Sequence, residues 1–121
     1  MMRSGVKPII FLLNNNGYTI ERYLHGEKAH YNDIVNWRWT KLLEVMGGVE
    51  GETCQSYTVR TKTELSNLLD APAFARADRI QLVEMIMETH DAPRGLKLQA
   101  ELSGKTNKYV SVGVKTASPT L

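Results

Sequence analysis

A run of amides closed by a glycine, Leu13-Asn14-Asn15-Asn16-Gly17, is the part of the sequence best suited to chemistry. It follows an apolar run, so we expect it where a buried parallel strand ends, and ligands of open α/β sheets bind beyond that edge. The amides offer neutral oxygens, and Gly17 lets the backbone turn and direct a carbonyl at a cation such as Mg²⁺. Glu21 lies four residues beyond Gly17, so one helical turn would place it over the same pocket. Taken alone, these residues favour the alternative of an ordinary Asn-Gly turn without a ligand.

Other residues with chemical potential have simpler expected roles. The spacing of the histidines does not match a metal cluster, so we expect surface or loop positions for His25, His30 and His90. Arg38 lies between two tryptophans and could stack on a nucleobase, but packing in a core or interface is favoured because no basic groove accompanies it. Cys54 follows an acidic stretch, which raises the pKa of a thiol and disfavours reactivity.

The composition excludes several classes of protein. The 121 residues suit one compact domain, and 42% hydrophobic and 23% charged residues are inconsistent with disorder over most of the chain. A net charge of +2 is too small to predict binding to nucleic acid or to an anionic membrane. The longest apolar run, residues 8–13, is too short to span a bilayer, and no secretory signal is expected. A lone cysteine excludes an intrachain disulfide and fits a reducing, cytoplasmic setting.

Three segments have the composition of β-strands. Residues 7–13 (KPIIFLL) form a continuous apolar run, which predicts a strand buried on both faces. Residues 56–61 (SYTVRT) are rich in β-branched and aromatic side chains, and residues 79–88 (RIQLVEMIME) alternate, with Ile80 and Leu82 expected to point inward.

Helices are predicted between and after these strands. They are expected over residues 18–24, over 33–46 until Gly47-Gly48 stops the helix, over 63–69 and over 95–109. Thr61 and Thr63 are both candidate N-caps for the third of these helices, and Thr61 and Glu64 have the spacing of a capping box. The alternation predicts an α/β fold, a three-layer αβα arrangement with a parallel sheet, over residues 1–110, followed by a disordered tail at 111–121. Because three strands leave two open edges, we expect this sheet to be part of a larger one.

The wider context of the Asn-Gly turn resembles a known family. Residues 2–37 contain the Asn14-Asn15 pair, the run Gly17-Tyr18-Thr19-Ile20-Glu21, then His25-Gly26, the run 31–34 (YNDI) and Trp37. This pattern closely resembles the C-terminal thiamine-diphosphate-binding domain of the pyruvate and indolepyruvate decarboxylases. Weaker similarity continues through residues 57–61, 83–84 and 91–93 and the last helix, so the resemblance covers nearly the whole chain apart from the tail.

The resemblance implies a role for each of four residues. Asn15 would bind Mg²⁺ through its side-chain oxygen, and Gly17 would bind the same ion through its backbone carbonyl. Ile20 would line the cofactor pocket beside the thiazolium ring. Glu21 would lie near the reacting carbon and relay a proton as the catalytic residue. Asn16 departs mildly from the family, where Asp or a small residue is common.

The implied activity is the decarboxylation of a 2-oxo acid to an aldehyde, with pyruvate the expected substrate. Such carboxy-lyases use thiamine diphosphate and Mg²⁺ and work as homo-oligomers with the active site between subunits. This sequence lacks the family's Gly-Asp-Gly motif, with its aspartate ligand, and the pyrimidine-binding domain, so it resembles a carboxy-terminal fragment. The isolated chain is therefore expected to be inactive. The alternative is a truncated, non-catalytic module that pairs with full-length decarboxylase subunits.

Overall fold

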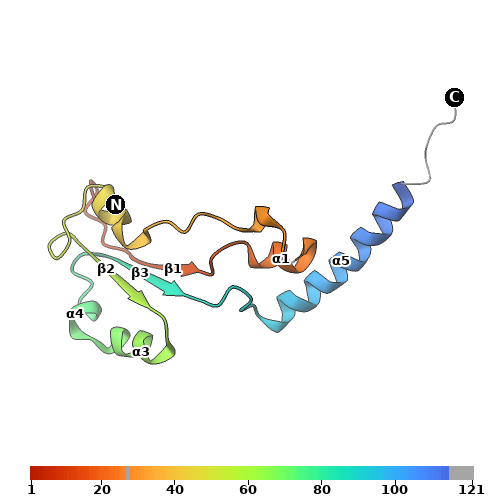
Figure 1. Ribbon diagram of the computed structural model, residues 1–121. Coiled ribbons are helices and arrows are strands. Elements are labelled where there is room, and N and C mark those ends of the chain that lie inside the picture. Colours follow the sequence, from red (N-terminus) through yellow and green to blue (C-terminus); the bar gives the residue numbers. More distant parts are fainter. Residues whose placement is uncertain (27, 115–121) are drawn as a thin grey trace. The chain divides into compact units, whose positions relative to one another are not determined.

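The computed structural model describes residues 1–26 and 28–114 (Figure 1). The chain divides into two compact units, one made of Met1–Asn14 and Val35–Glu88 and the other of Asn15–Ile34 and Thr89–Leu121. Within the described ranges, no helix combines the length and the apolar composition that crossing a bilayer requires.

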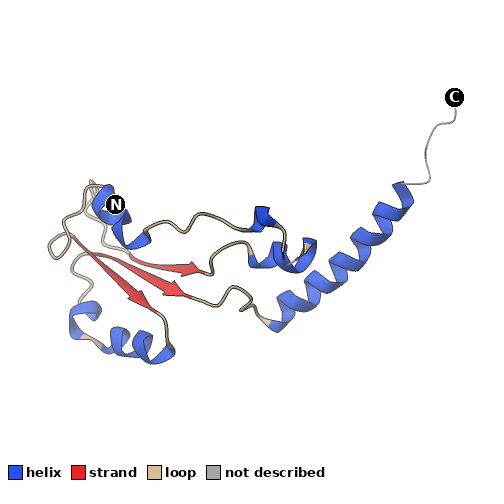
Figure 2. Cartoon of the chain, viewed as in Figure 1, coloured by secondary structure: helices blue, strands red, loops and turns tan. Residues whose placement is uncertain are grey.

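The first unit is built on a parallel sheet of three strands, visible as the red arrows in Figure 2. The strands are β1 (Ile9–Asn14), β2 (Cys54–Val59) and β3 (Ile80–Ile86), and their order in the sheet is β1-β3-β2. All three predicted strands are present, within two residues of their expected starts, and the predicted parallel pairing is confirmed.

The prediction of which strand is buried on both faces was wrong. The apolar run at residues 7–13 became the edge strand β1, in which Phe11 is 46% and Leu13 is 64% exposed. The last strand, β3, lies in the centre of the sheet, and its residues are buried consecutively rather than alternately, Leu82 and Val83 completely. A central strand is covered on both faces whatever its own pattern, and this position depends on the order of pairing, which hydrophobicity does not encode.

Helices cover both faces of this sheet, which confirms the predicted three-layer αβα arrangement. One face packs against the 3₁₀ turn η2 (Trp39–Lys41) and α2 (Leu42–Val45), and its buried core is Leu43, Cys54, Ile80 and Leu82. The opposite face is covered by α3 (Lys62–Asp70) and α4 (Pro72–Ala75), with Val59, Phe74 and Val83 in the core.

The α3 capping box is present as predicted. The Glu64 N–H donates to Thr61 Oγ1 at 3.1 Å, and the Thr61 N–H donates to Glu64 Oε2 at 3.2 Å. These two bonds satisfy backbone donors that the first turn of a helix would otherwise leave unpaired. Pro72 then occupies the first turn of α4, where a missing N–H costs nothing.

The long helix predicted over residues 33–46 was wrong in its first half. Only residues 39–45 are helical, as η2 and α2, while residues 33–38 have no regular secondary structure. Val35 is 79% exposed, so the apolar side chains of this stretch find no surface to cover. An isolated stretch of weak helix formers does not stay helical without such burial. Gly47, at a φ of +98°, lies directly after this helical segment as predicted.

The second unit consists of α1 (Thr19–His25), the 3₁₀ turn η1 (His30–Asn32) and the long helix α5 (Arg94–Val114). Helix α1 packs near α5, where the Tyr23 hydroxyl donates to the His90 carbonyl at 2.7 Å and Lys97 Nζ lies 5.8 Å from the Tyr23 ring centre. Helix α5 continues to Val114, into the segment predicted to be a tail, and residues 115–121 lie outside the described residues.

Candidate functional site

Asn14 anchors the carboxyl end of β1 and is a structural residue of the first unit. The Met87 N–H donates to its carbonyl at 2.9 Å, which continues the ladder to β3. Its side-chain Nδ2 donates to Glu84 Oε1 at 2.7 Å and to Asn36 Oδ1 at 2.9 Å. Glu84 lies on β3 and is only 8% exposed, so this amide solvates a buried carboxylate. The hydrogen bond between Asn14 and Glu84 joins residues 70 positions apart, so no local spacing predicts it.

Asn15 opens the turn of the second unit, and its amide is held at one end. Nδ2 donates to Thr19 Oγ1 at 2.7 Å, and Thr19 Oγ1 in turn donates to the Thr89 carbonyl at 2.6 Å. Among the described residues, none donates a hydrogen bond to Asn15 Oδ1. The half-buried Asn15 therefore presents a neutral oxygen with unused acceptor capacity, as a hard cation requires.

Gly17 occupies a position that no other residue fits. Its φ is +148°, and a Cβ atom added there would lie 2.4 Å from the Asn32 carbonyl oxygen and 2.6 Å from Arg22 Nη2. The neighbouring Tyr18 N–H donates to the same Asn32 carbonyl at 3.1 Å, which closes the turn against η1. The Gly17 carbonyl accepts no hydrogen bond from the described part of the chain, so it is a second available oxygen.

Arg22 stabilises this turn, a role that the sequence did not predict. Its Nη2 forms an ion pair with Asp33 Oδ1 at 2.6 Å and lies 3.3 Å from the Asn32 carbonyl and 3.5 Å from the Asn16 carbonyl. The guanidinium side chain is 9% exposed, so it is held among these oxygens rather than in water. Asn16 adopts a φ of +59°, a left-handed conformation that asparagine tolerates better than most residues. The i, i+11 spacing of Arg22 and Asp33 gives no signal in the sequence.

Ile20 and Glu21 lie in the first turn of α1, directly after the turn. Ile20 is half-buried, and the Glu21 carboxylate is partly exposed, with Oε2 3.3 Å from Nε2 of His25 one helical turn later. The second unit therefore carries all four predicted site residues on one short segment. His25 is added to them as a neighbour of Glu21, at the i, i+4 spacing that the sequence already contains.

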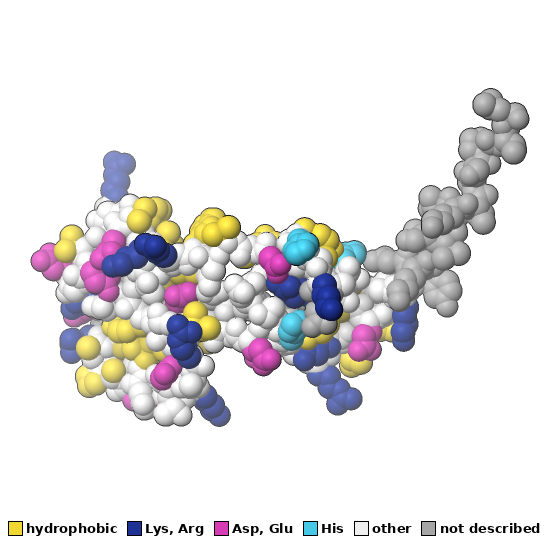
Figure 3. All heavy atoms as spheres, viewed as in Figure 1, with side chains coloured by type: hydrophobic (Ala, Val, Ile, Leu, Met, Phe, Trp, Pro, Cys, Tyr) yellow, Lys and Arg dark blue, Asp and Glu magenta, His cyan; other side chains and the backbone are white. Residues whose placement is uncertain are grey.

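The chemical character of this segment is that of neutral oxygen donors beside a single carboxylate. Among the described residues there is no group of three or more His, Cys, Asp or Glu side chains that could hold a metal ion by itself. A cation bound by Asn15 and Gly17 would therefore depend on negative charge supplied by a bound anion. On the face shown in Figure 3, basic and acidic side chains are interspersed over the described surface.

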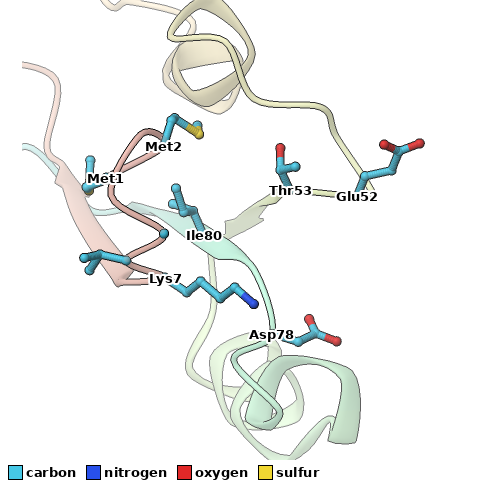
Figure 4. A pocket seen from close by; sticks show the side chains of 9 residues that line it. Met1, Met2, Lys7, Glu52, Thr53, Asp78 and Ile80 are labelled. Atoms are coloured by element: carbon cyan, nitrogen blue, oxygen red, sulfur yellow. The ribbon is translucent and has the colours of Figure 1, made fainter.

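A separate hollow of about 250 Å³ lies in the first unit and contains none of the predicted site residues. Its lining includes Met1, Met2, Lys7 and Ile80, and Figure 4 shows the Lys7 side chain extending toward Asp78. The hydrogen bond from the Arg79 guanidinium, at 2.8 Å, lowers the pKa of the Asp78 carboxyl, so this group is already paired.

No family model matches the chain. It is nevertheless similar to several curated proteins. A pyruvate decarboxylase of Aspergillus fumigatus is 44% identical over 108 residues, which cover 89% of this chain and 19% of that protein. The pyruvate decarboxylase of Candida albicans is 49% identical over 98 residues, 81% of this chain and 17% of that protein. Isozyme 1 of Saccharomyces cerevisiae is 40% identical over 107 residues, 88% of this chain and 18% of that protein. Over most of its length, the chain is therefore a homologue of a segment of the pyruvate decarboxylases that makes up about a fifth of those proteins.

Proposed function

We propose that this chain forms part of the cofactor site of a 2-oxo acid decarboxylase that uses thiamine diphosphate and Mg²⁺, with pyruvate as substrate. The similarity to pyruvate decarboxylases supports the reaction class. One structural observation supports the site: the Asn15 side-chain oxygen and the Gly17 carbonyl have no donor among the described residues, although the atoms around both are fixed. The chain spans about a fifth of the relatives, so other parts of the site would come from outside these 121 residues.

The donor set fits a Mg²⁺ ion that is shared with a diphosphate. Mg²⁺ takes oxygen ligands and is commonly held by few protein groups together with phosphate oxygens. Asn15 Oδ1 and the Gly17 carbonyl would supply two neutral ligands, and the diphosphate would supply negative charge. Ile20 would contribute apolar surface beside the cofactor ring.

Glu21 is the residue proposed to move a proton. Thiamine diphosphate, when bound, supplies the electron sink that accepts the electron pair left as carbon dioxide departs. Glu21 would hold a proton on its carboxyl group and deliver it near the reacting carbon, which aldehyde release requires. His25, 3.3 Å from the Glu21 carboxylate, would provide a neighbouring group that can exchange this proton.

Calorimetric titration of the 121-residue chain with Mg²⁺ and thiamine diphosphate tests this proposal, together with a coupled aldehyde assay on pyruvate. We expect weak cofactor binding that is lost in Asn15→Leu and retained in the matched control Asn67→Leu, which changes an exposed residue of α3. The isolated chain should release no aldehyde above the enzyme-free blank, because its described residues supply neither a carboxylate ligand for the metal nor a complete enclosed site. Binding heat that is identical in Asn15→Leu and the wild type would contradict the assignment of the metal site.

A second candidate function, a non-catalytic module that pairs with decarboxylase subunits, is favoured by the open edge of the sheet. Strand β1 is an edge strand, and Ile9, Phe11 and Leu13 on one of its faces are 36%, 46% and 64% exposed. Such an edge can pair with another chain. Mixing the chain with a full-length pyruvate decarboxylase, followed by size-exclusion chromatography with mass detection, would reveal a complex. Recovery of the chain only as free monomer would contradict this second function.

A further inference from the structure

The buried Thr19 hydroxyl links Asn15 to the Thr89 carbonyl through two hydrogen bonds. The residue is 7% exposed and opens α1. Its hydroxyl donates to the Thr89 carbonyl at 2.6 Å and accepts from Asn15 Nδ2 at 2.7 Å. Both distances are short for hydrogen bonds of these types, which indicates that the three groups are held closely together.

The donor and the acceptor in each of these two hydrogen bonds follow from the number of protons available. A backbone carbonyl can only accept, so the single hydroxyl proton of Thr19 is used on Thr89. The hydroxyl can then offer only a lone pair to Asn15, and the amide end that faces it must be the NH₂ group. The other end of the planar amide, Oδ1, is consequently directed away from Thr19.

We propose that Thr19 is a positioning residue for Asn15, which selects the amide orientation that offers Oδ1 rather than the NH₂ group to a divalent cation. This inference rests on the proposed function, because it assumes that Asn15 is a metal ligand. Without the hydroxyl, nothing on the Thr19 side would distinguish the two ends of the amide. A flipped amide would direct an NH₂ group at the cation, and the loss of such an outer partner typically weakens metal binding about 10- to 100-fold.

The test compares the 121-residue chain with Thr19→Val and Thr19→Ser, using Mn²⁺ in the presence of thiamine diphosphate as a paramagnetic probe in NMR spectra. Valine keeps the shape of threonine and removes the hydroxyl, whereas serine keeps the hydroxyl. Thr58→Val, at an exposed position of β2, is the matched control. The first readout needs no metal: it is the exchange rate of the Asn15 side-chain NH₂ protons with water. The second is the Mn²⁺ concentration that half-broadens the Gly17 amide signal.

We expect slow exchange of one Asn15 NH₂ proton in the wild type and in Thr19→Ser, and fast exchange in Thr19→Val. The Mn²⁺ affinity should fall about 10- to 100-fold in Thr19→Val and remain near the wild-type value in Thr19→Ser and Thr58→Val. Wild-type affinity in a folded Thr19→Val, or unprotected NH₂ protons in the wild type, would overturn the role of Thr19. The second of these outcomes needs no variant to fold. A complete lack of Mn²⁺ effects at Asn15 and Gly17 in the wild type would instead contradict the proposed metal site.

Discussion

Replacing Gly17 with alanine should disrupt the turn more than the same change at any other left-handed glycine of the second unit. The added Cβ would lie 2.4 Å from the Asn32 carbonyl oxygen and 2.6 Å from Arg22 Nη2, and real Cβ atoms essentially never come within 3.0 Å of an atom outside their own residue and its chain neighbours. The carbonyl would have to move by more than half an ångström to restore contact distance. That carbonyl also accepts from the Tyr18 N–H and from Arg22, so both hydrogen bonds would change together.

The size of the effect can be worked out against a control. Gly26 also has a positive φ, +110°, but a Cβ atom there would meet nothing within 4 Å. Gly26→Ala should therefore carry only the backbone strain, about 1–3 kcal/mol. Gly17→Ala should carry that strain and, in addition, an overpacking cost of about 1–3 kcal/mol. The difference between the two variants isolates the close approach to Asn32.

Amide hydrogen exchange measured by NMR is the appropriate assay, because it reports on each backbone N–H. The protection of the Tyr18 N–H should fall by about 5- to 150-fold more in Gly17→Ala than in Gly26→Ala, which is the overpacking cost converted at 1.4 kcal/mol per factor of ten. Exchange of the Leu82 N–H, in the central strand of the other unit, provides an internal reference. Equal protection of Tyr18 in the two variants would show that the Asn32 carbonyl does not constrain Gly17.

Three further predictions concern the first unit. Asn14→Ala removes the amide that solvates buried Glu84, so urea unfolding should show a loss of about 1–3 kcal/mol, against almost none for Asn67→Ala. Thr61→Ala removes the α3 cap and should cost about 1 kcal/mol in the same assay, whereas Thr63→Ala, at an exposed position of the same helix, should cost less. Burial, followed by the nearby Glu50 carboxylate, raises the pKa of the Cys54 thiol, so at pH 8 native protein should react with iodoacetamide only after unfolding. Because thiolate formation favours the unfolded chain, stability should fall as the pH rises above the ordinary thiol pKa of 9.0, and constant stability there would contradict this account.

Local sequence signals predicted most elements of the fold and the parallel direction of the strands, but not the order of the strands in the sheet. The capping box at Thr61 and the stop at Gly47 depend on residues a few positions apart, and both are present. The exchange of edge and centre between β1 and β3 could not be predicted, because both segments are apolar and the order of strands depends on long-range packing. The prediction of a helix over residues 33–46 was wrong in its first half for a related reason. The apolar side chains before residue 39 do not pack against another element, so burial does not stabilise a helix there.

The candidate site shows the same division between local and distant contacts. The roles expected of Asn15, Gly17 and Glu21 came from the family resemblance, because their types and spacing alone favour an ordinary turn. The Asn15–Thr19 hydrogen bond joins residues only four positions apart. Glu84 pairs with Asn14 and Thr89 pairs with Thr19, and in each pair the two residues are 70 positions apart. No local sequence pattern could have predicted these two hydrogen bonds. The sequence predicted a turn at Gly17. That the position requires glycine follows from the close approach of the Asn32 carbonyl, which only the folded chain shows.

The central claim, that this segment serves a decarboxylase through Glu21, is tested most directly in a chimeric enzyme. The matching segment of the Candida albicans pyruvate decarboxylase, 49% identical to this chain, would be replaced by the chain, and aldehyde release from pyruvate would be measured beside thiamine diphosphate binding. We expect the chimera to release aldehyde, Glu21→Gln to lower the rate about 10²- to 10⁴-fold with cofactor binding retained, and Glu101→Gln, at an exposed position of α5, to leave the rate unchanged. A chimera that binds the cofactor and releases aldehyde equally fast with glutamine at position 21 would contradict the account.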